Sequence, residues 1–64
     1  MIKRIVFPQE IVGLRKEFCV GDLLNGKEIS RIAFDDDNWI AFIDSVNMKI
    51  AYIIPMPGTI FYYD

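Results

Sequence analysis

From residue 29 to residue 63, the chain has segments with strand-like alternation that carry large apolar side chains on both faces. In the segment at 39–44, Trp39, Ala41 and Ile43 fall on one side, and Ile40 and Phe42 fall on the other. Neither side is polar, which is unlike a strand that has one face in water. A central strand covered on both sides would explain the pattern, and so would a barrel whose outside docks on another subunit.

The small size of the chain makes this apolar excess harder to hide. A chain of 64 residues is expected to be one domain, covering residues 1–64, and a domain this small buries only about 60% of its unfolded surface. With one cysteine and no histidine, neither an intrachain disulfide nor a structural zinc site can stabilise it. The hydrophobic content of 53% and the mean hydropathy of +0.27 therefore predict self-association into a homo-oligomer.

Turn residues divide the chain into short strands. Asn25-Gly26 is the sharpest signal, because a two-residue type I′ turn needs positive φ at both central positions. It predicts a hairpin between residues 18–24 and 27–34. Further turns at 35–38 and 45–47 continue the chain into a three-strand meander, with strands at 27–34, 39–44 and 48–54. A first strand at 2–7 ends at Pro8, and a last strand at 59–63 follows the break at 55–58.

The predicted class is therefore all-β: a small, strongly bent antiparallel sheet or an SH3-like, partly open barrel with a three-strand meander. The order of an extended stretch, Gly21-Asp22, the Asn-Gly turn and a meander resembles many SH3-like barrels, and this resemblance implies architecture only. For residues 8–17 the sequence is compatible with either a strand or one short helix. Ile11, Leu14 and Phe18 have helical spacing, while Gly13 interrupts it. No internal repeat is apparent.

The residue inventory argues against an enzyme. Without histidine, Cys19 lacks the usual base that would activate it as a nucleophile, so we interpret it as a small buried hydrophobe. No glycine-rich phosphate loop is present, and we expect no cofactor and no metal. The run Asp35-Asp36-Asp37 does not match a calcium loop, because Trp39 stands where an oxygen ligand is needed. We interpret the run as a solvated turn that could also act as an acidic knob for an arginine-lined groove.

Aromatic and basic residues supply the remaining candidates for binding. Trp39, Tyr52, Tyr62 and Tyr63 could anchor a protein interface or stack on bases, although Trp39 is also suitable core filler. Arg31 and Lys49 could add phosphate contacts. The candidate binding residues are Arg31, Asp35, Asp36, Asp37, Trp39, Lys49, Tyr52, Tyr62 and Tyr63.

Three functional hypotheses follow. The first is a non-enzymatic binding or inhibitor protein that occupies a macromolecular partner, such as a phage or mobile-element product acting on a host protein. The second is a homo-oligomer that binds a small nucleotide ligand between subunits. The third is an SH3-like nucleic-acid-binding barrel, although the net charge of -2 and pI of about 4.9 argue against duplex binding. No apolar stretch reaches membrane-span length, so a cytoplasmic protein is expected.

Overall fold

The computed structural model describes residues 1–11, 13 and 15–64, which form eight β-strands, with Gly13 in a 3₁₀ turn. Val12 and Leu14 lie outside the described residues. The strands are β1 (Ile2–Val6), β2 (Glu17–Cys19), β3 (Leu23–Leu24), β4 (Lys27–Glu28), β5 (Arg31–Phe34), β6 (Ile40–Ile43), β7 (Lys49–Ile53) and β8 (Ile60–Tyr63).

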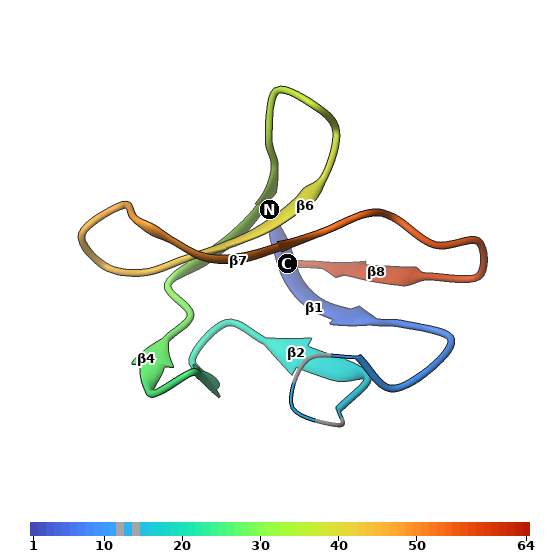
Figure 1. Cartoon of the computed structure of the whole chain (residues 1–64), viewed down its shortest axis with the longest axis horizontal. Helices are drawn as coiled ribbons and strands as arrows, with labels where there is room; N and C mark the ends of the chain where they lie inside the picture. The colour runs from blue at the N-terminus through green and yellow to red at the C-terminus, as the bar shows by residue number, and fades with distance from the viewer. Residues whose placement is uncertain (12, 14) are drawn as a thin grey trace.

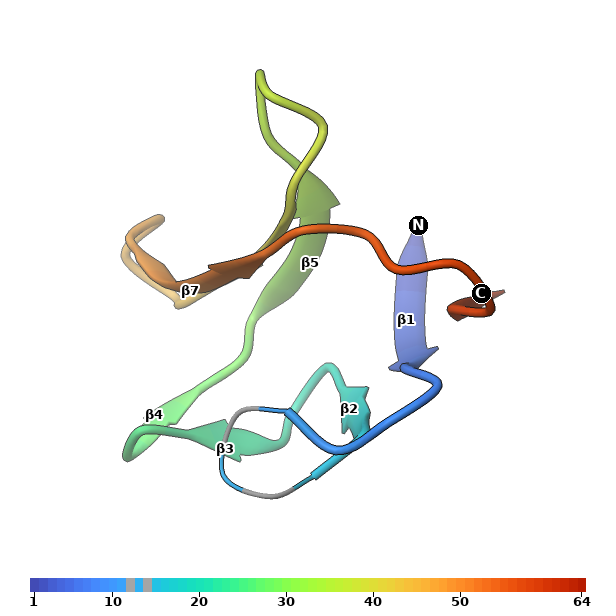
Figure 2. The same ribbon diagram turned by 45° about the vertical axis from the view of Figure 1, so that its right-hand side comes forward.

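Six of the strands form one strongly curled antiparallel sheet (Figures 1 and 2). Its order is β2-β1-β5-β6-β7, with β8 also paired to β1. Arg4 pairs with Cys19 of β2 and with Tyr62 of β8, so these two strands lie on opposite edges of β1. β5 joins β1 only at Ile2. The prediction of a small all-β, partly open barrel with the meander β5-β6-β7 is confirmed.

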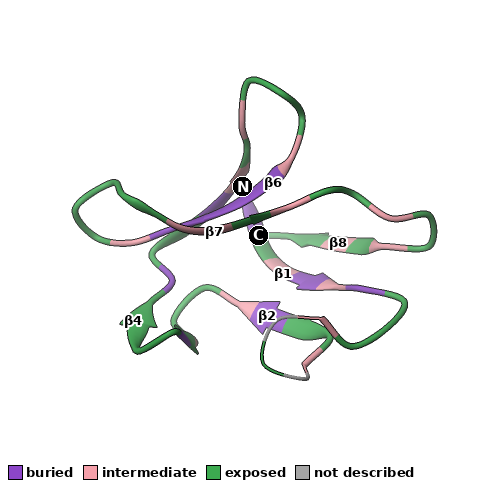
Figure 3. Ribbon diagram, viewed as in Figure 1, coloured by how far each residue is buried: buried purple, intermediate pink, exposed green. Residues whose placement is uncertain are grey.

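The barrel core is built around three aromatic rings. The ring centre of Phe18 lies 5.9 Å from that of Phe7 and 5.1 Å from that of Phe42, and all three side chains are buried. Every residue of β6 is also buried, although its side chains alternate between the two faces of the sheet (Figure 3). Both faces of this central strand are therefore covered within one chain, and a second subunit is not needed to cover β6.

The turn between β5 and β6 is organised by one carboxylate. Asp35 Oδ1 accepts the backbone N–H groups of Asp37 at 2.9 Å and Trp39 at 3.0 Å. The N–H of Asn38 donates to the Asp35 carbonyl oxygen at 3.0 Å, and Asn38 has a φ of 64°. Asparagine tolerates this left-handed conformation better than most residues do.

The turn between β6 and β7 repeats the same arrangement. Asp44 Oδ1 accepts the N–H groups of Val46 at 3.0 Å and Met48 at 2.8 Å, and Asn47 also has a φ of 64°. The two turns share an Asp-x-x-Asn sequence in Asp35–Asn38 and Asp44–Asn47. This shared turn motif is local and is not an internal repeat of the kind considered in the sequence.

Two backbone hydrogen bonds join the described residues on either side of the segment after β1. The N–H of Phe7 donates to the Lys16 carbonyl at 2.7 Å, and the N–H of Ile11 donates to the Arg15 carbonyl at 2.8 Å. In a helix, the N–H of the later residue would donate to the earlier carbonyl, so these bonds run in the opposite sense. Among the described residues of 8–17, for which a short helix is one expectation, only Gly13 lies in a helical turn, of the 3₁₀ kind. The part of that expectation that concerns Val12 and Leu14 lies outside the described residues.

The Asn25-Gly26 hairpin is confirmed, with φ values of 53° and 77°, but its strands are shorter than expected. The predicted strand at 27–34 is interrupted between β4 and β5. Ile29 exchanges backbone hydrogen bonds with the preceding arm, because its N–H donates to Asp22 O and its carbonyl accepts from Gly21 N, each at 2.8 Å. Ser30 N then donates to Ile43 O, so the chain changes partner at this point.

Candidate functional site

The outer face of the meander is the surface of β5, β6 and β7 that points away from the core. Ala33, Ala41 and Tyr52 are direct neighbours in the sheet register. Alternation along each strand places four further side chains on this face. They are Arg31 in β5, Asp35 just after β5, Trp39 just before β6 and Ile43 in β6. Ala41 and Ile43 are buried there, although they lie opposite the core. Larger neighbouring side chains therefore cover this face from outside.

A β-bulge changes which side chains of β7 lie on that face. Phe42 pairs with Ala51, whereas the next residue, Ile43, pairs with Lys49, so Ile50 is the extra residue. Simple alternation would place Ile50 on the same side as Tyr52. Instead Ile50 packs against the core, and Lys49 reaches the side of Tyr52. The bulge thus assembles residues that the sequence alternation separates.

Asp35, Trp39, Lys49 and Tyr52 meet on this face, and we call them the aromatic corner. The rings of Trp39 and Tyr52 lie 5.4 Å apart, centre to centre, with a 48° tilt. Lys49 Nζ lies 5.6 Å from the centre of the Tyr52 ring and 3.5 Å from Asp35 Oδ2. The Asp35 side chain is only 11% exposed, whereas that of Lys49 is 50% exposed. The corner therefore combines a nearly buried carboxylate, two aromatic rings and a solvent-exposed cation.

Opposing effects set the pKa of Asp35. Loss of hydration alone would raise the pKa of this carboxyl group. The N–H donors of Trp39 and Asp37, together with the Lys49 ammonium group, outweigh that effect and hold the pKa below its ordinary value of 3.8. Asp35 is therefore ionised at neutral pH, and its negative charge is a fixed part of the corner.

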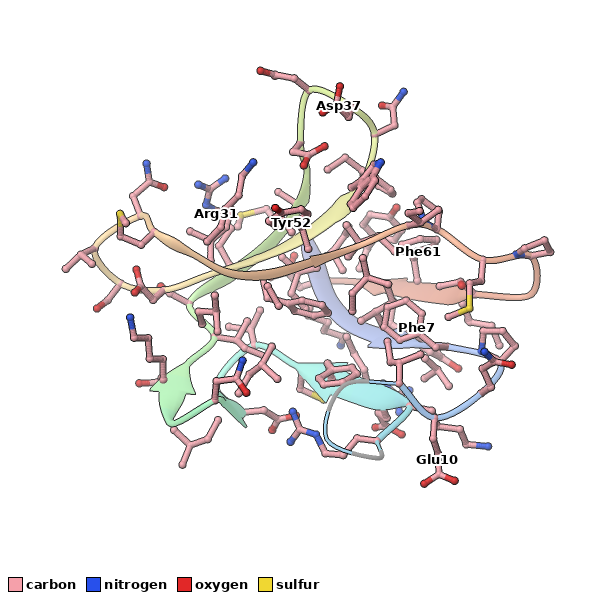
Figure 4. All side chains as sticks on the ribbon, viewed as in Figure 1. Phe7, Glu10, Arg31, Asp37, Tyr52 and Phe61 are labelled. Carbon is pink, nitrogen blue, oxygen red and sulfur yellow. The ribbon has the colours of Figure 1, made fainter. Side chains whose placement is uncertain are left out.

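The remaining candidates from the meander border this corner. Arg31 is exposed on β5 and donates from Nη2 to Asn47 Oδ1 at 2.6 Å. Asp36 and Asp37 are exposed in the first turn, and Figure 4 shows Asp37 at its tip. Sequence reasoning missed Asn47 and Asp44 as organising residues, although the repeated Asp-x-x-Asn pattern could have indicated them.

Tyr62 and Tyr63 do not join the aromatic corner. Tyr62 lies on β8, where the guanidinium carbon of Arg4 sits 3.9 Å from its ring centre, and Arg4 also forms a 3.1 Å ion pair with Glu17. Tyr63 pairs with Ile2 and is 60% exposed. Both tyrosines are exposed, but they belong to the part of the sheet built on β1.

Cys19 lies on β2 opposite Arg4 and is partly buried. Desolvation, followed by the negative charges of Asp22 and Glu17, raises the pKa of its thiol above the ordinary value of 9.0, while Arg4 acts in the opposite direction. The thiolate is therefore a minor species at neutral pH, which disfavours nucleophilic reactivity.

The described part of the chain contains no pocket and no group of three or more acidic or cysteine side chains placed to hold a metal ion. It also contains no helix that is long and apolar enough to cross a membrane. No protein-family model, curated protein or solved structure matches the chain. The candidate site is therefore defined by its own geometry alone.

Proposed function

We propose that this chain is a non-enzymatic binding protein that occupies a macromolecular partner with the outer face of its meander. The observation that carries the proposal is the ring pair of Trp39, just before β6, and Tyr52, on β7, which lie 5.4 Å apart with Tyr52 57% exposed. Aromatic anchors of this kind dominate the binding energy of many protein interfaces.

The corner is well suited to a protein partner because much of it is already ordered. The backbone N–H of Trp39 donates to Asp35 Oδ1, and the Trp39 ring packs against Tyr52. Aromatic side chains have few rotatable bonds, so they offer a large contact area at a low cost in conformational entropy. Arg31 and the acidic residues Asp36 and Asp37 surround the corner with both signs of charge, which favours a specific orientation of the partner.

A small nucleotide ligand is less well supported by this geometry. Small-molecule sites are usually concave and bury most of the ligand, whereas the described residues form no pocket. Such a ligand would need a second subunit to supply a wall. Single-stranded nucleic acid is also less favoured, because the Trp39 and Tyr52 rings pack on each other and the chain has a net charge of -2. A protein surface is the partner class that does not require a cavity.

Occupying the partner would be sufficient for activity, because a bound chain can block a functional surface without any chemistry. This gives the inhibitor role a physical basis. It also makes the outer face, and not a catalytic set, the part of the molecule that determines function.

Affinity capture with a matched pair of variants tests the proposal. The wild-type chain, Tyr52→Ala and Tyr63→Ala are immobilised and exposed to lysate from the cells that express the protein. Tyr52 and Tyr63 are 57% and 60% exposed, so the two substitutions remove comparable exposed aromatic area. We expect a specific protein on the wild type, at least about tenfold less on Tyr52→Ala, and unchanged capture on Tyr63→Ala. Loss of capture with Tyr63→Ala alone would place the binding surface on β8 and refute the proposal.

A further inference from the structure

We propose that the aromatic corner is a binding site for one ammonium group, which Lys49 fills in the free protein and a lysine side chain of the partner replaces in the complex. This inference rests on the proposed function, because it names the chemistry by which the outer face recognises its partner. The site consists of Asp35 Oδ2 and the Trp39–Tyr52 ring pair.

The two oxygens of Asp35 have different roles. Oδ1 accepts two backbone N–H groups, from Asp37 and Trp39, and both bonds hold the turn together. Oδ2 faces Lys49 Nζ, which is its only hydrogen-bond donor among the described residues. Asp35 can therefore offer one oxygen to a cation without disturbing the turn.

Lys49 is a weak occupant of the site. Its Nζ lies 3.5 Å from Oδ2, longer than the 2.7–2.9 Å or so of a strong charge-assisted hydrogen bond. It also lies 5.6 Å from the Tyr52 ring centre, near the outer limit of about 6 Å for a cation–π contact. Half of the Lys49 side chain is exposed, so it can move into solvent without a change in the backbone. These distances leave the Asp35 charge only loosely paired within the chain.

The single available oxygen favours an ammonium over a guanidinium group. Arginine gains its advantage at carboxylates by binding both oxygens at once. At Asp35 the two N–H donors already occupy Oδ1, so this bidentate arrangement is blocked. Lysine binds as a point charge and needs only Oδ2 with an aromatic ring beside it. Lys49, which occupies the site in the free protein, carries an ammonium group, in agreement with this preference.

The experiment measures binding of N-acetyl-lysine methylamide to wild-type and Lys49→Ala protein by NMR, with the indole resonance of Trp39 as the reporter. Trp39 is the only tryptophan in the chain, so the signal is unambiguous. We expect saturable binding to Lys49→Ala that is at least about threefold tighter than to the wild type, because the tethered Lys49 no longer competes. The arginine analogue of the probe should bind more weakly, and the uncharged norleucine analogue should not bind.

The double variant Asp35→Asn/Lys49→Ala is the control for charge. Asparagine retains an oxygen for the two N–H donors, so the turn is kept while the negative charge is removed, and a thermal melt checks the fold. Binding of the lysine probe should be lost. Equal affinity in wild type and Lys49→Ala, retained binding in the double variant, or tighter binding of the arginine probe would each overturn the inference. Because the probe is a small molecule, these results are independent of whether a partner is captured through Tyr52.

Discussion

Asp44 performs, after β6, the same hydrogen-bonding role that Asp35 performs before it. Each carboxylate accepts two N–H groups of its own turn through Oδ1, and each turn ends in an asparagine with a φ of 64°. The central strand is thus set between two copies of one local motif. Asp35 differs because its second oxygen also faces Lys49, which places the candidate site at one copy only.

Replacing Asp44 with alanine should lower the free energy of unfolding by about 1–2 kcal/mol, because the N–H groups of Val46 and Met48 lose their acceptor. Urea denaturation measures the change. Asp44→Asn should lie within about 0.5 kcal/mol of wild type, because the amide oxygen can still accept both bonds. If alanine and asparagine were equally destabilising, the acceptor role of Asp44 would be wrong.

Acid should destabilise the wild type more than Asp35→Asn. The pKa of Asp35 in the folded protein is below 3.8, so the unfolded chain binds this proton more readily. The stabilisation is complete above the unfolded pKa and is lost as the pH falls through the lower folded value. Thermal melts between about pH 5 and 2 should therefore show a steeper fall in Tm for the wild type. Parallel curves for the two proteins would contradict this.

The left-handed conformation of Asn47 gives a third prediction. Asn47→Val should cost about 1–2 kcal/mol, because a β-branched residue is strained at a φ of 64°, while Asn47→Gly should be close to neutral. Ser45→Val is the control, since Ser45 is exposed in the same turn and has no positive φ. Chemical denaturation compares the three variants. A large loss in Ser45→Val would show that the turn rejects valine for a different reason.

Phe18 should be the most sensitive of the aromatic positions in the core. It is fully buried between Phe7 and Phe42, so Phe18→Leu should lower stability by about 1–2 kcal/mol through lost packing. For a domain of this size the loss corresponds to roughly 4–8 °C in Tm per kcal/mol. Phe34→Leu is the matched control and should cost less than half as much, because Phe34 is 46% exposed. Equal losses would place Phe18 outside the core.

Self-association remains a prediction for the apolar residues near the outer strands. Among the described residues, β7 pairs only with β6 and β8 only with β1. The exposed residues Ile54 and Ile60 lie just after β7 and at the start of β8. Light scattering across a concentration series should give a mass above 7.4 kDa for the wild type and a lower mass for Ile54→Lys/Ile60→Lys. Leu23→Lys, on the β3–β4 hairpin, should leave the mass unchanged. A wild type that stays at 7.4 kDa at every concentration would mean that the chain does not self-associate.

Features that depend on neighbouring residues could be predicted from the sequence. The Asn25-Gly26 turn, the meander and the break before β8 all follow from turn chemistry and alternation over a few positions. For the same reason, the aromatic and charged residues of the candidate site could be named individually. Which of these residues lie together could not be predicted. In the sequence, Tyr62 and Trp39 are equally plausible neighbours of Tyr52, and only long-range strand pairing distinguishes them.

The sequence by itself determined the all-β class, the positions of most strands and turns, and the lack of the usual catalytic residues. The tertiary structure decided which residues meet. The bulge at Ile50 moved Lys49 to the side of Tyr52, and long-range strand pairing separated Tyr62 and Tyr63 from Trp39. It also covered both faces of β6 within one chain. Alternation specifies the two sides of a strand, but a bulge or a covering side chain depends on partners that are distant in the sequence.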